Sequence, residues 1–184
     1  MSIADGSYVI GPESGRLLVK TARTGLGAKA GHDLTIEATR WRGHVVISTA
    51  SPGSSSVSVE VDVDSLEVRE GTGGVKPLTD SDRADIRETF LTKILDASRH
   101  PAIAFASRRV SGKPESFTVE GDLTIMGVTH PLTVDGQLDG GHARGAAVVT
   151  QSRWGIRPYS AFLGALRLRD EVEILFELNL AAGT

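Results

Sequence analysis

The sequence predicts an all-β protein, an antiparallel barrel or sandwich of eight or nine strands with one amphipathic helix at about residues 80–95. Apolar and polar residues alternate with a period of two over most of the chain, which is typical of strands that bury one face. Short turns rich in glycine and proline separate these stretches. A single stretch has the three- and four-residue apolar spacing of a helix. At 184 residues, the chain fits one domain over 1–184.

The strands of the N-terminal half follow from this alternation. In 57–64 every odd residue is valine and every even residue is polar, so Val59 and Val61 are expected on the buried face. A turn at 51–53, which contains proline and glycine, precedes this strand. Weaker alternation predicts three earlier strands, at 16–23, 32–38 and 41–48.

The helix is predicted over 80–95, where five apolar residues from Ile86 to Leu95 form one stripe. Three aspartates lie in its first turns and a lysine in its last, which matches the helix dipole. Residues 71–79 are expected to form the loop before it, and Pro101 ends the connection after it. We expect this helix to pack across one barrel end or one flank.

The C-terminal half shows the stronger alternation. It predicts strands at 117–125, 128–138 and 166–180, and weaker ones at 102–110 and 143–152. Gly127 interrupts the alternation between the first two and indicates a tight hairpin.

Composition excludes several classes of function. The net charge is −3 and the pI about 5.9, which argues against a general nucleic-acid binder. The absence of cysteine excludes disulfides, thiolate metal sites and a cysteine nucleophile. No signal peptide is visible, and no apolar run approaches the roughly 18 residues that span a bilayer. We expect a cytoplasmic protein without a transmembrane segment, or a periplasmic or secreted one if a leader was removed.

Catalytic signatures are absent from the sequence. The glycine-rich stretch 25–31 has one residue too many for a dinucleotide fingerprint, and there is no P-loop, nucleophile elbow or His-Glu-x-x-His motif. The five histidines are dispersed, without ligand spacing. Asp62 and Asp64 share the outward face of their strand, where a solvated face is the simpler interpretation. We therefore predict no catalytic residue, no metal site and no cofactor.

Four polar residues fall in phase with buried apolar neighbours: His32, Arg109, His130 and Asp170. Each needs an explanation, because burying a polar group without a partner is costly. One explanation is that residues near strand ends have left the sheet or bond to the backbone. The other is that they orient a ligand inside a barrel that its own side chains do not fill. Asp170 with either histidine is also consistent with a buried structural pair.

Several stretches together resemble the YceI-like family, from Tyr8-Val-Ile10 to Arg153-Trp-Gly155-Ile, over about residues 8–180. The most specific is the hairpin 121–134, with Gly-Val-Thr-His-Pro at 127–131. The resemblance implies an eight-stranded antiparallel, lipocalin-like barrel with one helix, enclosing an elongated apolar pore. It also implies binding of polyisoprenoids or other long amphiphilic lipids, often with quinone-like or prenyl-phosphate heads.

Strand phase, rather than the resemblance, gives the residues expected to line the pore. The inward phase is rich in valine, alanine and glycine, so a barrel of this size has room for one ligand. Two of the predicted residues, Trp154 and Phe162, cluster with Tyr159, where either a gated portal or a loop over the barrel end is expected. The predicted ligand-binding residues are His32, Leu34, Ile36, Trp41, Val59, Val61, Phe105, Arg109, Val119, Leu123, His130, Leu132, Val134, Trp154, Phe162, Asp170, Val172 and Ile174.

The sequence thus predicts a non-catalytic protein that binds and carries a long-chain isoprenoid or fatty lipid. Two alternatives stay open. One is an enzyme on a small hydrophobic substrate, with His32, His130 and Asp170 as acid–base groups. The other is a stress-related protein with a closed barrel and no ligand. A homodimer is compatible with the sequence, which does not decide the assembly.

Overall fold

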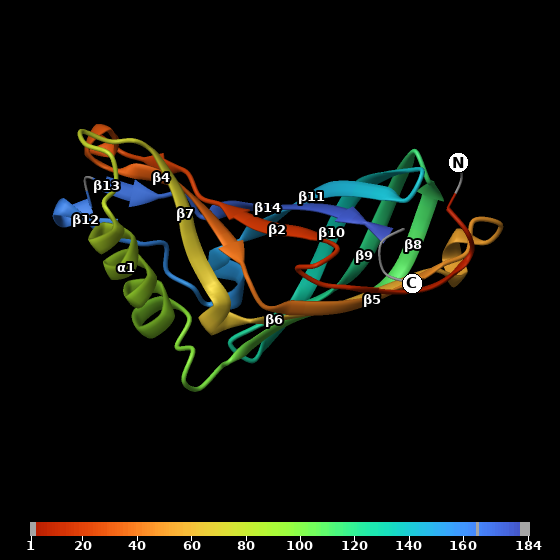
Figure 1. The fold of residues 1–184 in the computed structure, drawn as a ribbon. Helices are drawn as coiled ribbons and strands as arrows, with labels where there is room; N and C mark the ends of the chain where they lie inside the picture. The colour runs from red at the N-terminus through yellow and green to blue at the C-terminus, as the bar shows by residue number, and fades with distance from the viewer. Residues whose placement is uncertain (1–2, 165, 181–184) are drawn as a thin grey trace.

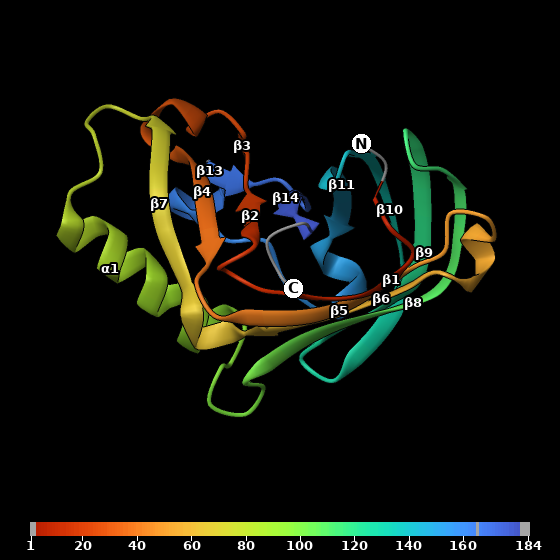
Figure 2. The ribbon, with the colours of Figure 1, turned by 45° about the vertical axis from the view of Figure 1, so that its right-hand side comes forward.

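A curled antiparallel sheet dominates the structure, a computed structural model that describes residues 3–164 and 166–180. Within these residues, a sheet of eleven strands wraps around an elongated interior, and three short strands form a second sheet at one end (Figure 1). One α-helix in the described part of the chain lies along the flank of that same end (Figures 1 and 2). The predicted mostly-β architecture with one helix is confirmed.

The elements have the following bounds. The large sheet contains β1 (Gly6–Ile10), β2 (Gly15–Lys20), β4 (His32–Ala38), β5 (Trp41–Ile47), β6 (Ser56–Asp62), β7 (Leu66–Gly73), β8 (Ala102–Lys113), β9 (Ser116–Ile125), β10 (Val128–Asp139), β11 (His142–Thr150) and β14 (Glu171–Asn179). The small sheet contains β3 (Arg23–Thr24), β12 (Ser160–Ala161) and β13 (Leu166–Leu168). Helix α1 (Asp80–Thr89) continues into a π-turn, η4 (Phe90–Ile94). The short 3₁₀ segments are η1 (Ala28–Ala30), η2 (Pro52–Ser54), η3 (Val63–Ser65), η5 (Gln151–Trp154) and η6 (Phe162–Gly164).

The predicted number of eight strands is not confirmed, because the large sheet has eleven strands in the described part of the chain. Part of the difference comes from one bend. Only Thr39 and Arg40 separate β4 from β5, and only η3 separates β6 from β7. On one side of the bend β4 pairs with β7, and on the other side β5 pairs with β6. At the bend, the amides of Thr39 and Asp62 donate to the carbonyls of Ser65 and Arg40, both at 3.1 Å. The backbone pairing therefore continues round the interior through the bend.

Several other strand assignments differ from the sequence prediction. Strand β7 (Leu66–Gly73) is not predicted from the sequence, because its apolar alternation is short. It extends into the predicted loop 71–79. The predicted strand 166–180 is split into β13 and β14, because the chain turns at Arg169 and Asp170 to move from the small sheet to the large one. The predicted strand 16–23 is divided between β2 in the large sheet and the start of β3 in the small one, and β1 and β12 are strands that the sequence does not predict. The remaining predicted strands are present, with boundaries shifted by a few residues at most.

A capping box holds the N-terminus of the helix, and a buried phenylalanine anchors its C-terminal end. At its N-terminus, Thr79 and Asp82 form a capping box: the Asp82 amide donates to the Thr79 hydroxyl at 3.1 Å, and the Thr79 amide donates to the Asp82 carboxylate at 2.8 Å. At the other end, Phe90 is buried in the main apolar cluster together with Leu34 and Ile36 from β4. The helix and the π-turn that prolongs it thereby cover one flank of the barrel.

The capping box makes the stability of the helix depend on pH. The pKa of Asp82 is lowered from its ordinary value of 3.8, chiefly because the Thr79 amide donates a hydrogen bond to the charged carboxylate. The stabilisation is therefore present above the unfolded-state pKa and is lost as the pH falls through the lower folded-state pKa. We expect Asp82→Asn to lower the Tm at pH 7, and the difference from wild type to vanish at a pH below the folded-state value. Circular dichroism at both pH values measures this, with Glu115→Gln in the β8–β9 turn as the control; an equal difference at both would contradict it.

Candidate functional site, an apolar cavity along the barrel

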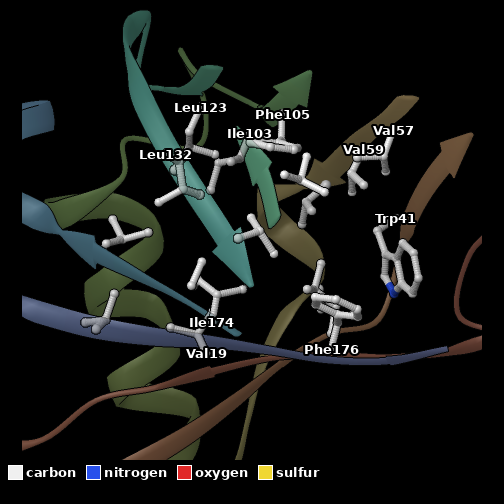
Figure 3. Close-up of a pocket in the computed structure, with 18 of the residues that line it drawn as sticks. Val19, Trp41, Val57, Val59, Ile103, Phe105, Leu123, Leu132, Ile174 and Phe176 are labelled. Carbon is white, nitrogen blue, oxygen red and sulfur yellow. The ribbon is translucent and has the colours of Figure 1, made fainter. Parts of the chain in front are cut away.

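The large sheet encloses a cavity of about 760 Å³ that runs along the barrel. Its walls come from β2, β4, β5, β6, β8, β9, β10, β11 and β14, and from α1 with its π-turn. Figure 3 shows apolar side chains from several of these strands converging on the interior, among them Val19, Val59 and Ile174. The middle of the wall is aliphatic and aromatic, so the space suits an apolar molecule.

Strand alternation places most of the predicted residues in this wall. Each strand turns every second side chain inward, and the apolar phase of the sequence is the inward phase of the barrel. The predicted residues that line the cavity are His32, Leu34, Ile36, Trp41, Val59, Val61, Phe105, Val119, Leu123, Leu132, Val134, Val172 and Ile174.

Other lining residues were not in the predicted set. Phe117 and Phe176 have the inward parity of β9 and β14, so strand phase could have found them. Ile86, Phe90 and Ile94 belong to the apolar stripe of the helix, and only the tertiary fold shows that this stripe closes the cavity. A helical stripe by itself does not reveal which surface it covers.

The phenylalanine rings leave the interior open because each lies over a glycine of a neighbouring strand. A Cβ placed on Gly136 would come within 2.5 Å of the ring of Phe117, and one on Gly121 or Gly145 would meet a ring at 2.5 or 2.6 Å. The missing side chains therefore provide room for the rings against the wall. The pairs are Phe105 with Gly121, Phe117 with Gly136, and Phe176 with Gly145.

The prediction that Arg109 faces the pore is wrong. The register between β8 and β9 shifts between Ser107, which pairs with Gly121, and Arg109, which pairs with Glu120. One extra residue in β8 reverses the alternation, so Arg109 is exposed and Val110 lines the cavity instead. Sequence phase counts residues and cannot see such a bulge.

His130 and Trp154 also lie outside the cavity wall, although both were predicted to line it. Trp154 is 2% exposed, and its indole N–H donates to the Leu123 carbonyl at 2.9 Å. The His130 ring meets the indole edge-on, with 5.4 Å between the ring centroids. The two rings pack against each other. Trp154 belongs to a second apolar cluster, whose other buried members, among them Leu123 and Val149, line the cavity.

Asp170 has a structural role at the turn before β14 and is not a lining residue. The Ser152 amide donates to one of its carboxylate oxygens at 2.8 Å and the Ser152 hydroxyl donates to the other. These bonds tie η5 to the turn between β13 and β14, which explains why a polar residue interrupts the apolar phase there. The side chain of Phe162, the remaining predicted residue, lies outside the described part of the structure; its neighbour Tyr159 lines the cavity.

The polar groups of the wall gather at the two ends of the cavity. One end, near η2 and the β8–β9 hairpin, has Ser48, Thr49 and Lys113. The other end, near β3, β12 and β13, has Tyr159 and His32, whose Nε2 lies 2.7 Å from the Lys76 carbonyl oxygen. His32 also lines a smaller pocket beside α1, which shares Ala30, His32, Asp85 and Ile86 with the main cavity.

No acid–base constellation forms from the three groups considered in the enzyme alternative, all of which are described. His32 interacts with the Lys76 carbonyl, His130 with the Trp154 ring, and Asp170 with Ser152. Each is engaged by a different partner in a different part of the molecule. Within the described ranges, no cluster of three or more histidine or acidic residues could hold a metal ion. None of the helices described here is long and apolar enough to cross a membrane.

One polar atom in the middle of the wall has no partner. Trp41 is 7% exposed, and its Nε1 is the one buried side-chain nitrogen or oxygen of the described residues that forms no hydrogen bond. In Figure 3 this nitrogen lies on the side of the indole nearer to Phe176. A buried donor without an acceptor is costly. An acceptor on a bound molecule would remove this cost.

Comparison with known proteins identifies the fold. A family model described as a YceI-like domain matches residues 14–180. Among solved structures, BcnA of Burkholderia cenocepacia has a TM-score of 0.63 and 19% identity, over 88% of this chain and 94% of that chain. The YCEI protein of Campylobacter jejuni has a TM-score of 0.57 and 13% identity, over 78% and 81%. A mutant CJ YCEI protein with a monobromobimane guest has a TM-score of 0.61 and 12% identity, over the same shares. No curated protein matches the chain.

A tryptophan placed in the inward phase should obstruct the cavity. Val134 on β10 faces Val119 across the strand pair, and both line the cavity. We expect Val134→Trp to abolish uptake of a fluorescent long-chain probe and to cost about 1–3 kcal/mol of stability through overpacking. Thr133→Trp, one residue earlier on the outward, exposed face, is the matched control and should leave uptake unchanged. Undiminished uptake by folded Val134→Trp would contradict the assignment of this cavity.

Proposed function

Because this chain belongs to the YceI-like family, whose lipocalin-like fold binds hydrophobic ligands, we propose that it binds and carries one long-chain amphiphilic lipid without catalysing a reaction. The ligand we propose is a polyisoprenoid, a prenyl phosphate or a quinone-like lipid. The observation that best supports this proposal is the apolar cavity of about 760 Å³ that strand phase and the bends of the sheet leave unfilled.

The size of the cavity suits a long chain. The cavity provides about 760 Å³, within the range of about 300–1,000 Å³ that small-molecule sites occupy. Because this space runs along the barrel and is lined mainly by apolar side chains, it suits one extended chain.

Burial of apolar surface supplies the affinity in this proposal. Each CH₂ group transferred from water to the wall contributes about 0.8 kcal/mol. A tail that fills the middle of the cavity needs few polar contacts, which agrees with a wall that is mainly apolar. A charged head group such as a phosphate would then lie at one of the cavity ends with its chain in the aliphatic middle, whereas the uncharged ring of a quinone-like lipid would lie in the middle beside Trp41.

Trp41 adds a preference to this otherwise non-specific wall. Its unpartnered N–H favours a ligand that brings an acceptor oxygen, such as a carbonyl, to the middle of the cavity over a pure hydrocarbon. Hydrogen bonds of this kind contribute modestly to affinity, so Trp41 selects among lipids that the apolar wall already holds.

Analysis of the freshly purified protein tests the carrier proposal directly. Native mass spectrometry should show an adduct of several hundred daltons that disappears on organic extraction, and mass analysis of the extract should identify an isoprenoid or another long-chain lipid. The apolar wall is expected to retain such a lipid through purification. An adduct-free mass after expression in several hosts, together with no uptake of added polyprenyl lipids, would refute the proposal.

Removal of the indole N–H tests the role of Trp41. We expect Trp41→Phe to weaken binding of a quinone-like lipid by about five- to tenfold, since one hydrogen bond to a buried donor is lost. Binding of squalene, a hydrocarbon without an acceptor, should stay within twofold of wild type. Titration by the quenching of intrinsic fluorescence or by calorimetry measures both. Equal changes for the two ligands would show that Trp41 contributes only ring volume.

A further inference from the structure

The end of the barrel that carries the small sheet exposes apolar side chains at its tips. Leu26, in the loop before η1, and Leu163, in η6, are both fully exposed. Leu163 also has a left-handed backbone conformation, with φ of 54°, which residues with a side chain adopt reluctantly. Water provides no favourable partner for either leucine, so their position needs another explanation.

The segments that carry these leucines are basic, although the whole chain is acidic. Residues 21–31 and 156–169 contain five cationic side chains and no aspartate or glutamate, in a protein of net charge −3. Among the described residues, Arg23 forms an ion pair with Asp33, with Nε and Oδ1 3.5 Å apart, and the other four form none. The five are Arg23, Lys29, Arg157, Arg167 and Arg169.

The two segments lie together in space. Strand β13 pairs with β3 on one side and β12 on the other, and the side chain of Leu166 lies against Gly31. Figure 1 shows these elements at the same end of the molecule. We call Leu26, Leu163 and the five cationic residues the basic rim. Acidic residues also lie beside it: Asp33, paired with Arg23; Asp170, which follows Arg169 in the chain and accepts hydrogen bonds from Ser152; and Asp82 and Asp85 of α1, which line the side pocket with His32.

The basic rim surrounds one mouth of the cavity. His32, Tyr159, Leu166 and Leu168 line the cavity at this end, and Tyr159 is also partly exposed. At the opposite end, η2 and the β8–β9 hairpin contribute serines, a lysine and a glutamate, and none of their described residues is an exposed large hydrophobic. The two mouths therefore differ in chemistry.

We propose that the basic rim docks on the surface of an anionic lipid bilayer, with this mouth of the cavity toward the membrane. Cationic side chains are attracted to anionic lipid head groups, and apolar side chains insert at the boundary between head groups and acyl chains. Tyrosine is enriched at the same membrane–water interface. Leu26 and Leu163 are separate apolar side chains among cationic ones. This arrangement suits binding to a lipid surface better than binding to a protein, whose interface would need a contiguous apolar patch. Docking would let a lipid pass between membrane and cavity without crossing water; this last step rests on the proposed function, and docking itself does not.

Sedimentation with empty vesicles tests the docking without any cavity ligand. We expect wild type to bind vesicles that contain phosphatidylglycerol and phosphatidylcholine, with much weaker binding to phosphatidylcholine alone and weakening as salt increases. Lys29→Gln, Arg157→Gln and Arg169→Gln together should lower the partition coefficient by about a hundredfold at low salt. Leu26→Ser with Leu163→Ser should lower it by about tenfold.

The matched control is Val9→Ser with Val148→Ser, which removes two exposed valines from β1 and β11 and should leave vesicle binding unchanged. Equal binding by the leucine variant and this control, or no wild-type binding to anionic vesicles, would overturn the proposal. So would a leucine variant whose only change, measured by analytical ultracentrifugation without vesicles, is in its oligomeric state, because the rim would then be a protein interface. Loss of lipid uptake with intact vesicle binding would count against the proposed function alone.

Discussion

The structure depends on keeping the interior of a β-barrel open, against the tendency of inward side chains to fill it. The apolar cavity lining from β6 is valine and that from β10 is leucine and valine, without a phenylalanine, tyrosine or tryptophan. Where the wall carries an aromatic ring, as at Phe117, the facing strand supplies a glycine beneath it. Cross-strand pairs of a ring over a glycine support the sheet and let the ring lie against the wall.

The same constraint explains where the true core lies. Since the middle of the barrel is hollow, tight packing is moved to its margins. One cluster joins the helix and its π-turn to β4 and the bend of the sheet, around Phe90 and Val63. The other lies under the β9–β10 hairpin, where Trp154 is held by the Leu123 carbonyl and contacts His130. Most members of both clusters also line the cavity, so their side chains pack against one another along the wall while the space between the walls stays unfilled.

Polar chemistry is distributed along the cavity in a way that suits an amphiphile. The ends carry hydroxyl, imidazole and ammonium groups, and the middle carries one unpartnered donor, Trp41 Nε1. His130 contacts the Trp154 ring, Asp170 accepts hydrogen bonds from Ser152 at a turn, and Arg109 is exposed to solvent. These three polar residues, which alternate in phase with apolar ones, thus each have a structural explanation. His32 is the exception, because it lines the cavity at one end.

The sequence by itself determined the inward and outward faces of β6, β9, β10 and β14, because a period of two is a local property that regular strand geometry preserves. It also determined the helix, from its stripe and its acidic start. Only the tertiary structure decided where the alternation breaks: the bulge at Ser107 and Arg109 turns Val110 inward, and the turn at Asp170 takes β13 into another sheet. It alone showed that Trp154 is buried without lining the cavity and that the helical stripe lies on the cavity. Such features depend on which strands pair and how the sheet bends, and those contacts join residues far apart in the chain, beyond the reach of a local pattern.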